Sequence, residues 1–156
     1  MKARPLYLES TEIPAERTSM EIIAALQTAG ARQITLEYAA SGKITGLKFV
    51  LLVGGLPYPF KLPARVEAVQ KIFKDRRIKT AAWNAYKFEA RDAEQAERVA
   101  WRQLLAWVKA QLAMIATGMV QAHEVFSPYL LNQTGETLFE ILVETKFKPL
   151  PPGKEA

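Results

Sequence analysis

The spacing of hydrophobic residues changes along the chain, and the first regular pattern predicts a helix. Residues 1–17 contain two prolines, lack a clear period and are expected to form an extended N-terminal segment. Hydrophobic residues then recur every three or four positions over residues 22–29, as on the buried face of a helix. Thr18 and Glu21 fit a capping box at its start, and Gly30 can adopt the left-handed conformation that ends a helix. We therefore expect this helix to begin at Thr18 and to end at Gly30.

The pattern then switches to a period of two, which predicts three antiparallel strands. Apolar and polar residues alternate over residues 33–38, as in a strand with one buried face. The apolar residues expected on the buried face of the next two strands are Leu47, Phe49, Leu51 and Val53, then Leu56, Tyr58, Phe60 and Leu62. Gly54 and Gly55 between these strands predict a two-residue hairpin. Pro57 and Pro59 lack N–H groups on one side of the third strand, which only the edge of a sheet tolerates.

Two further helices are predicted after the sheet. Pro63 suits the first position of the second helix. The buried stripe of this helix would consist of Val66, Val69, Ile72 and Phe73. Residues 76–90 show no regular period and predict a long connection. A long third helix is expected from Asp92 to Gly118, because its apolar residues keep helical spacing. These residues are Trp101, Leu104, Leu105, Val108, Leu112 and Ile115.

The last part of the chain predicts shorter elements. A helical segment is expected over residues 121–131, with an interruption near its Ser-Pro pair, and a turn over residues 132–135. Thr137 and Glu140 fit a second capping box, which would open a last helix over residues 137–144. A strand is nearly as good an interpretation of these last residues.

These elements predict a single α+β domain over residues 18–145, in which a three-stranded antiparallel meander packs on helices. The domain would include a long C-terminal helix and short helical segments. The extended segment over residues 1–17 would precede it, and the proline-rich tail over residues 146–156 is expected to be disordered. The length of 156 residues fits one domain with its own core.

The composition excludes several classes of site. The chain has no cysteine and a single histidine, His123, so it can form neither a disulfide nor a metal site of thiolates or of two histidines. No cofactor is expected. The N-terminus lacks the apolar region of a secretory signal, and the longest apolar stretch, residues 49–56, is too short to span a membrane as a helix. We therefore expect a cytosolic protein without a membrane partner.

The positive charge of the chain is concentrated in one segment. The net charge is +5, and residues 61–79 alone carry seven basic residues against Glu67 and Asp75. These basic residues are Lys61, Arg65, Lys71, Lys74, Arg76, Arg77 and Lys79. Basic and acidic residues balance, at fourteen each, in the rest of the chain. A concentrated basic patch attracts phosphate groups more strongly than the same charge spread over the surface.

Aromatic residues follow this basic segment, and together they predict a surface for single-stranded nucleic acid. The candidate contacts are Lys71, Lys74, Arg76, Arg77, Lys79, Trp83, Tyr86 and Lys87. The cations would contact phosphates while Trp83 and Tyr86 would stack on bases. The alternative interpretation is that the lysines coat a solvated helix face and that Trp83 and Phe88 fill the core beneath a loop. Both interpretations stay open.

The sequence offers no comparable candidate for catalysis. His123 and Glu124 could act as an acid–base pair, but no serine is marked as their nucleophile, and a structural role for His123 is favoured. Glu37 is expected in a solvated, outward position on its strand. The chain has no acidic cluster for Mg²⁺, and Gly54-Gly55 lacks the rest of a phosphate-binding loop. We therefore expect a protein that binds rather than an enzyme.

The segment AERVAWRQLLAWVKAQLAMIATGMVQAHEVFSPYLL, followed by GETLFE, carries a family resemblance. Over residues 96–140 it resembles a group of small proteins encoded by bacteriophages and prophages. The preceding helix, hairpin and FKLP sequence at residues 60–63 are compatible with this group. The resemblance implies a mobile-element origin and a place in the host cytosol, where compact basic proteins serve replication, recombination or host takeover. It assigns no catalytic or ligand-binding residue.

Two functional hypotheses follow. The first is a nucleic-acid-binding accessory protein of a phage or mobile element, which would bind single-stranded DNA through the basic segment and the aromatic residues after it. The alternative is a protein-interaction module, such as a phage inhibitor or assembly factor. Its working surface would be the alanine-rich face of the long helix around Trp101 and Trp107, which could also mediate homo-oligomerisation.

Overall fold

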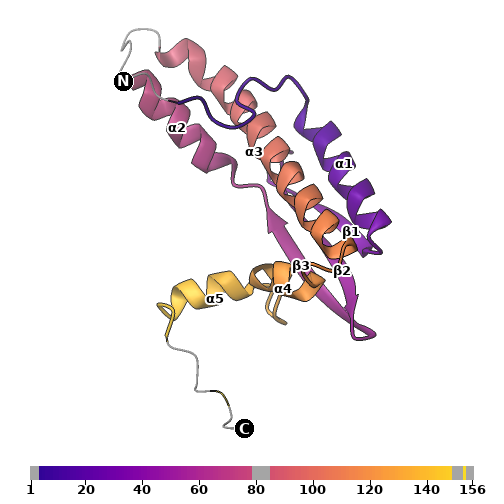
Figure 1. Ribbon diagram of the computed structural model, residues 1–156. Helices are drawn as coiled ribbons and strands as arrows, with labels where there is room; N and C mark the ends of the chain where they lie inside the picture. The colour runs from indigo at the N-terminus through magenta and orange to yellow at the C-terminus, as the bar shows by residue number, and fades with distance from the viewer. Residues whose placement is uncertain (1–3, 79–84, 149–152, 154–156) are drawn as a thin grey trace.

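Helices and a sheet pack on each other around one main hydrophobic core. The computed structural model describes the backbone of residues 4–78, 85–148 and 153, and the side chains of these residues except 77–90. In chain order the elements are α1 (Ala15–Thr28), β1 (Arg32–Tyr38), β2 (Ile44–Val53), β3 (Leu56–Pro63), α2 (Val66–Ile78), α3 (Ala85–Ala116), α4 (Ala122–Phe126), the 3₁₀ helix η1 (Ser127–Tyr129) and α5 (Leu138–Glu144). In Figure 1, α3 lies between α1 and α2. The predicted α+β class, with its meander, long helix and short helical segments, is confirmed.

Helix α1 begins earlier than predicted. Its N-cap is Pro14, and no side chain caps the first turn. Thr18 lies inside the helix, fully buried, and its hydroxyl donates to the carbonyl of Pro14 over 3.3 Å. Glu21 accepts a hydrogen bond from Arg102 of α3 instead of capping the helix. The capping-box prediction is therefore wrong, because both residues serve contacts within the fold. Gly30, with a φ of +92°, ends the helix as predicted.

The sheet has the predicted antiparallel order β1-β2-β3. Phe49 pairs directly with Phe60 in β2 and β3, so the two apolar faces align. The hairpin between them turns through Gly54 and Gly55, with φ of +59° and +82°. Positive φ at both central positions gives the type I′ turn that matches the twist of the strands.

Strand β3 is an edge strand, as its prolines predicted. Its outer edge is met by Leu131, whose N–H donates to the carbonyl of Pro59 over 3.0 Å. By the alternation of side chains along the strand, Leu56 and Tyr58 belong to the buried face. They are nevertheless 60% and 36% exposed, respectively. They lie near the hairpin, beyond the reach of the main core. The predicted buried face is therefore correct only for the second half of β3.

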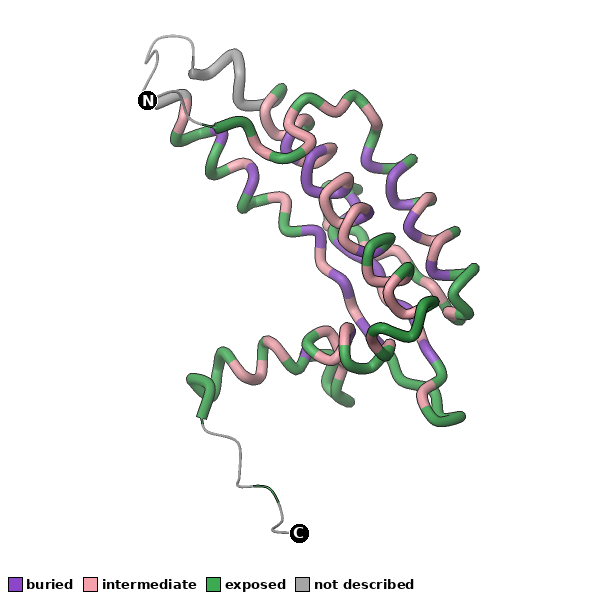
Figure 2. The backbone as a smooth tube through the Cα atoms, in the orientation of Figure 1, coloured by how far each residue is buried: buried purple, intermediate pink, exposed green. Residues whose placement is uncertain are grey.

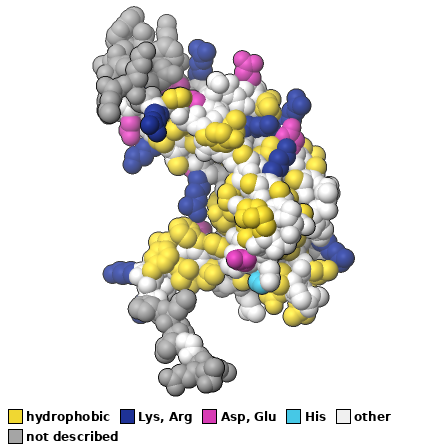
Figure 3. Space-filling model, in the orientation of Figure 1, with side chains coloured by type: hydrophobic (Ala, Val, Ile, Leu, Met, Phe, Trp, Pro, Cys, Tyr) yellow, Lys and Arg dark blue, Asp and Glu magenta, His cyan; other side chains and the backbone are white. Residues whose placement is uncertain are grey.

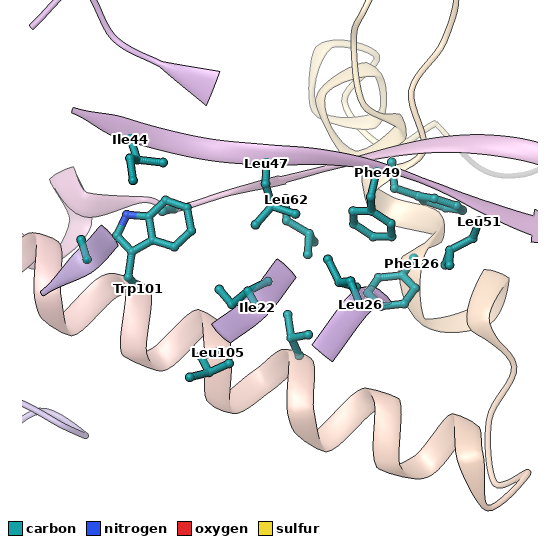
Figure 4. Close-up of a cluster of buried hydrophobic side chains, with 14 residues drawn as sticks. Ile22, Leu26, Ile44, Leu47, Phe49, Leu51, Leu62, Trp101, Leu105 and Phe126 are labelled. Carbon is teal, nitrogen blue, oxygen red and sulfur yellow. The ribbon is translucent and has the colours of Figure 1, made fainter. Parts of the chain in front are cut away.

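The main core lies between the sheet, α1 and α3. Trp101 and Val108 of α3 and Ile22 of α1 are fully buried against it, and Figure 2 shows the buried positions following the inner faces of these elements. Phe126 of α4 enters the same core, as Figure 4 shows. Its ring lies 5.4 Å from that of Phe49 and 5.9 Å from that of Phe60, measured between centroids. Phe126 thus anchors α4 in the main core.

A second, smaller core joins α2 to α3. Val69 and Phe73 of α2 pack against Ala96, Val99 and Ala100 of α3. Small side chains on α3 allow α2 to approach closely, since helix separation depends on side-chain size at the contact. Ala96 and Ala100 are therefore covered by α2 of the same chain.

Three predictions for the region around α2 are wrong. Pro63 pairs with Gly46 as the last residue of β3, and α2 begins only at Val66. Ile72, expected in the buried stripe, is 39% exposed. The region 76–90 is not one long connection, because its first residues end α2 and its last six begin α3.

No helix within the described parts of the chain is long and apolar enough to cross a membrane.

The C-terminal elements include α5, for which the helix prediction is confirmed over the strand alternative. Thr137 Oγ1 accepts the N–H of Glu140 over 3.2 Å, and the Glu140 carboxylate accepts the N–H of Thr137 over 2.7 Å. Hydrogen bonds from the backbone and hydroxyl of Thr137 lower the pKa of Glu140, and the charges of Lys61 and Arg65 lower it further. Phe147, expected in a disordered tail, donates its N–H to Leu142 and closes the end of α5. Residues 149–152 and 154–156 of the predicted tail lie outside the described residues.

Glu37 of β1 connects the three strands on the outer face of the sheet. Its carboxylate lies 2.9 Å from the Lys48 ammonium and 3.2 Å from that of Lys61. These lysines are directly opposite each other in β2 and β3, where like charges would repel without the carboxylate. Burial raises the pKa of Glu37, but hydrogen bonds from both lysines and their charges outweigh it and hold the pKa below its usual 4.5. The outward position is as predicted, with the carboxylate paired.

Replacing the aromatic anchor of α4 should destabilise the whole domain. We expect Phe126→Ala to lower the free energy of unfolding by about 3–5 kcal/mol, because it removes a buried aromatic ring and leaves a cavity. Urea denaturation followed by circular dichroism measures the change. Met119→Ala, at a position that is 71% exposed, is the control and should change stability by less than about 0.5 kcal/mol. A similar small change for Phe126→Ala would contradict the assignment.

The bridging role of Glu37 predicts a pH-dependent effect. Glu37→Gln should lower the free energy of unfolding at neutral pH by about 0.5–1 kcal/mol, since it leaves two lysines facing each other. Because the pKa of Glu37 is lowered in the folded state, its stabilisation is complete above the usual value of 4.5 and is lost as the pH falls through the lowered value. The difference between wild type and variant should therefore shrink in acid. Exposed Glu12→Gln is the control, and a pH-independent difference for Glu37→Gln would refute the explanation.

Candidate nucleic-acid interface

The solvent face of α2 carries the first two predicted contacts. Since α2 buries Val69 and Phe73 against α3, the opposite side of the helix faces solvent, and Lys71 and Lys74 are exposed there. Among the described residues, neither lysine has a carboxylate within 4.0 Å. Their spacing of three residues places them as neighbours on the helix surface. The two ammonium groups are thus available to an anionic ligand.

Acidic residues share this face of α2. Glu67 and Asp75 are exposed, and each lies four residues from Lys71 along the helix, close enough to weaken the local potential. The described side chains on the exposed face therefore carry as many negative as positive charges. Arg65, just before the helix, is also exposed, but its guanidinium lies over the Phe139 ring, 5.1 Å from the centroid.

Arg76 has a structural role that the sequence did not reveal. Its guanidinium contacts the carboxylate of Glu9 at 2.5 Å and donates to the carbonyl of Arg4 over 2.9 Å. On α3, the amide of Gln95 donates to the carbonyls of Glu9 and Thr11 over 2.8 and 2.9 Å. These bonds hold the N-terminal segment across α2 and α3. The charge of Arg76 is thus matched by a carboxylate 67 residues away in the sequence, and its predicted phosphate contact stays a prediction.

Tertiary ion pairs reduce the charge excess that the sequence showed. Of the seven basic residues in segment 61–79, Lys61 is paired with Glu37 and Arg76 with Glu9. Both carboxylates come from outside the segment, so counting charges along the sequence misses them. Much of the positive charge that remains in this segment belongs to Arg77 and Lys79. The attraction for polyanions is accordingly weaker than the local sequence predicts.

The remaining predicted contacts fall around the connection from α2 to α3. Arg77 belongs to the last turn of α2, and Tyr86 and Lys87 belong to the first turn of α3, while their side chains lie outside the described part. Lys79 and Trp83 lie outside the described residues altogether. Helices α2 and α3 run side by side in opposite directions (Figure 1). The fold thus brings the two helix ends that carry these residues to one end of the molecule.

A polar hollow near the N-terminal segment is a feature that the sequence did not indicate. It is lined by the charged residues Glu9, Glu12, Arg91, Asp92 and Arg98, together with Ser10 and Gln95, and has a volume of about 570 Å³. Its acidic residues outnumber the arginines, which does not favour a polyanion. The hollow joins residues from the N-terminal segment and α3, and such long-range neighbours leave no local signal.

The candidate catalytic pair serves the local structure. The carboxylate of Glu124 accepts the N–H of Gln121 over 3.1 Å and so caps α4. The carbonyl of His123 accepts the Ser127 hydroxyl as α4 gives way to η1. Among the described residues there is also no group of three or more histidine or acidic side chains that could hold a metal ion.

The tryptophan face of α3 is covered by the chain itself. Trp101 is fully buried in the main core. Trp107 packs with its ring centroid 5.9 Å from Phe126 and 5.6 Å from Tyr129. Trp101 is therefore part of the core and Trp107 is partly covered by α4 and η1, whereas the use of the alanine-rich face of α3 for a partner or a second copy stays a prediction.

The role of Arg76 can be tested separately from binding. We expect Arg76→Gln and Glu9→Gln each to release the N-terminal segment and to lower stability by about 1 kcal/mol, the scale of a partly exposed charged hydrogen bond. The double variant should cost little more than either single one. Hydrogen exchange over residues 4–14 reports the release, with Arg17→Gln, which alters a more exposed ion pair, as the control. Additive effects of the two changes would contradict the pairing.

Comparison of the chain with protein-family models, with curated proteins and with solved structures gave no match. The resemblance of residues 96–140 to phage-encoded proteins therefore stays a prediction from the sequence. No relative contributes a functional residue, so we infer the function from the charges and surfaces of this chain.

Proposed function

We propose that this protein acts by binding single-stranded nucleic acid, as an accessory protein of a phage or mobile element in the host cytosol. The observation that carries the proposal is the pair Lys71 and Lys74, which are exposed and adjacent on α2 without a carboxylate within 4.0 Å among the described residues. Arg77 follows at the same spacing of three. The binding surface would run along this side of α2 towards its C-terminal end.

Each part of this surface would have a different role. Lys71, Lys74 and Arg77 would contact successive phosphates, and Lys79 and Lys87 would extend the cationic path. Trp83 and Tyr86 would stack on bases, which requires bases that are not paired in a duplex. We do not include Arg76 among the proposed phosphate contacts, because it holds the N-terminal segment through Glu9.

The mixed charge of α2 favours a single strand as the ligand. A duplex carries phosphates at twice the axial density of one strand and rewards a strongly basic surface. The face of α2 has acidic Glu67 and Asp75 beside its lysines, so phosphate contacts alone would be weak. Base stacking would then supply a large part of the affinity, and a single strand offers more accessible bases.

The proposal predicts how affinity depends on salt. Lys71→Gln/Lys74→Gln should weaken binding to labelled single-stranded DNA and reduce the slope of log affinity against log salt by about 1.4, or 0.7 for each lost phosphate contact. Trp83→Ala should cost about 1–3 kcal/mol of binding free energy through lost stacking. Fluorescence anisotropy over a salt series, with single- and double-stranded oligonucleotides, measures both effects.

The matched control removes the same charge elsewhere. Arg17→Gln/Lys109→Gln changes two exposed cations on α1 and α3 and should leave the salt slope nearly unchanged. Equal losses in the two double variants would indicate attraction to net charge rather than a site on α2. Absence of binding at low salt would remove the proposal.

A further inference from the structure

Helix α5 has a hydrophobic surface that the rest of the chain leaves uncovered. Five of its seven residues, in the sequence LFEILVE, are apolar, yet none is buried. Leu138 and Val143 are 37% and 49% exposed, and Phe147 after the helix is 57% exposed. In Figure 3, hydrophobic side chains gather over the projecting α5 at the lower left of the molecule. A helix of this composition is normally held against a hydrophobic partner.

The outer face of the sheet has a second uncovered hydrophobic surface. A hollow of about 450 Å³ lies across the three strands and is lined by Arg32, Gln33, Val50, Leu52, Pro57 and Pro59. Leu52 is 47% exposed, and both prolines are exposed. No residue of α5 lines this hollow, so the two surfaces do not cover each other within one chain.

The two surfaces have opposite charges at their borders. Glu140 and Glu144 lie on α5, and Glu136 precedes it. On the sheet, Arg32 borders the hollow. Lys48 and Lys61 lie on the same outer face beside the carboxylate of Glu37. Since Lys61 also acts on Glu140 of its own chain, the charges that a partner copy would pair are chiefly Glu144 on α5 and Arg32 on the sheet. A hydrophobic helix bordered by carboxylates therefore fits a hydrophobic hollow bordered by cations, and both occur in every copy of the chain.

We propose that the protein forms a two-fold symmetric dimer in which α5 of each copy docks into the outer sheet hollow of the other. Two-fold symmetry repeats each contact, so the α5–sheet pairing occurs twice in one closed interface. Val143 would contact the hollow near Leu52, with Glu144 near Arg32. The surface is separate from α2, and the inference does not depend on nucleic-acid binding.

Cysteine trapping tests the pairing directly, because the chain has no native cysteine. Copies with Val143→Cys and differently tagged copies with Leu52→Cys are mixed and mildly oxidised. We expect a disulfide between the two kinds of chain, since such a bond requires the two Cα atoms to approach within about 7 Å. Met119→Cys, exposed after α3, replaces Val143→Cys in the control and should give little product with Leu52→Cys. Trapping no better than in the control would overturn the docking geometry.

Sedimentation across a concentration series tests association without a cross-link. Val143→Asp and Leu52→Asp should each raise the dimer dissociation constant about tenfold or more, as for a residue at the centre of an interface, whereas Met119→Asp should not. Mixing Val143→Asp with Leu52→Asp should restore association in part, because one intact α5 then meets one intact hollow. Circular dichroism verifies the fold of each variant. A wild-type protein that stays monomeric, or a dimer that is insensitive to both changes, would overturn the proposal.

Discussion

The packing of α3 is the constraint on which the rest of the structure depends. Along this helix the buried side chains change from small to large. Ala96 and Ala100 let α2 approach closely, whereas Trp101 and Val108 fill the space between the sheet and α1. On the same helix, Trp107 packs against Phe126 and so fixes the start of the C-terminal elements. Because each neighbour depends on a different segment of α3, this single helix determines where α1, α2, α4 and the sheet can lie.

The distribution of charge follows from this packing. Once α2 lies on α3, Arg76 faces the N-terminal segment and pairs with Glu9, while formation of the sheet brings Lys61 to Glu37. Both ion pairs neutralise a basic residue of the segment 61–79. Lys71 and Lys74 escape such pairing among the described residues because they occupy the side of α2 opposite its buried stripe. The surface proposed for nucleic acid is thus the part of the basic segment that folding leaves exposed.

The same architecture leaves two hydrophobic surfaces without a partner, on α5 and on the outer face of the sheet. A sheet with helices on one side has one open face, which is ordinarily polar, but here Val50, Leu52 and two prolines line it. Helix α5 is tied to the body by the Leu138 N–H, which donates to the carbonyl of Leu130, by Leu131 at the edge of β3 and by Arg65 over Phe139. These contacts hold the N-terminal end of α5, while Val143 near its C-terminal end stays exposed. The basic and hydrophobic surfaces lie on different elements, so the proposed nucleic-acid binding and the proposed self-association would not compete for one surface.

The sequence by itself determined the elements whose signals are local. The Gly54-Gly55 hairpin, the edge position of the strand with Pro57 and Pro59 and the capping box of α5 were all predicted, because each depends on backbone geometry within a few residues. Only the tertiary structure decided where α1 begins and how α2 and α3 extend into the expected connection. It also decided that Trp101 is buried in the main core and that Arg76 holds the N-terminal segment through Glu9. In each of these the deciding partner is distant in sequence, and burial or ion pairing with it outweighs a weak local preference.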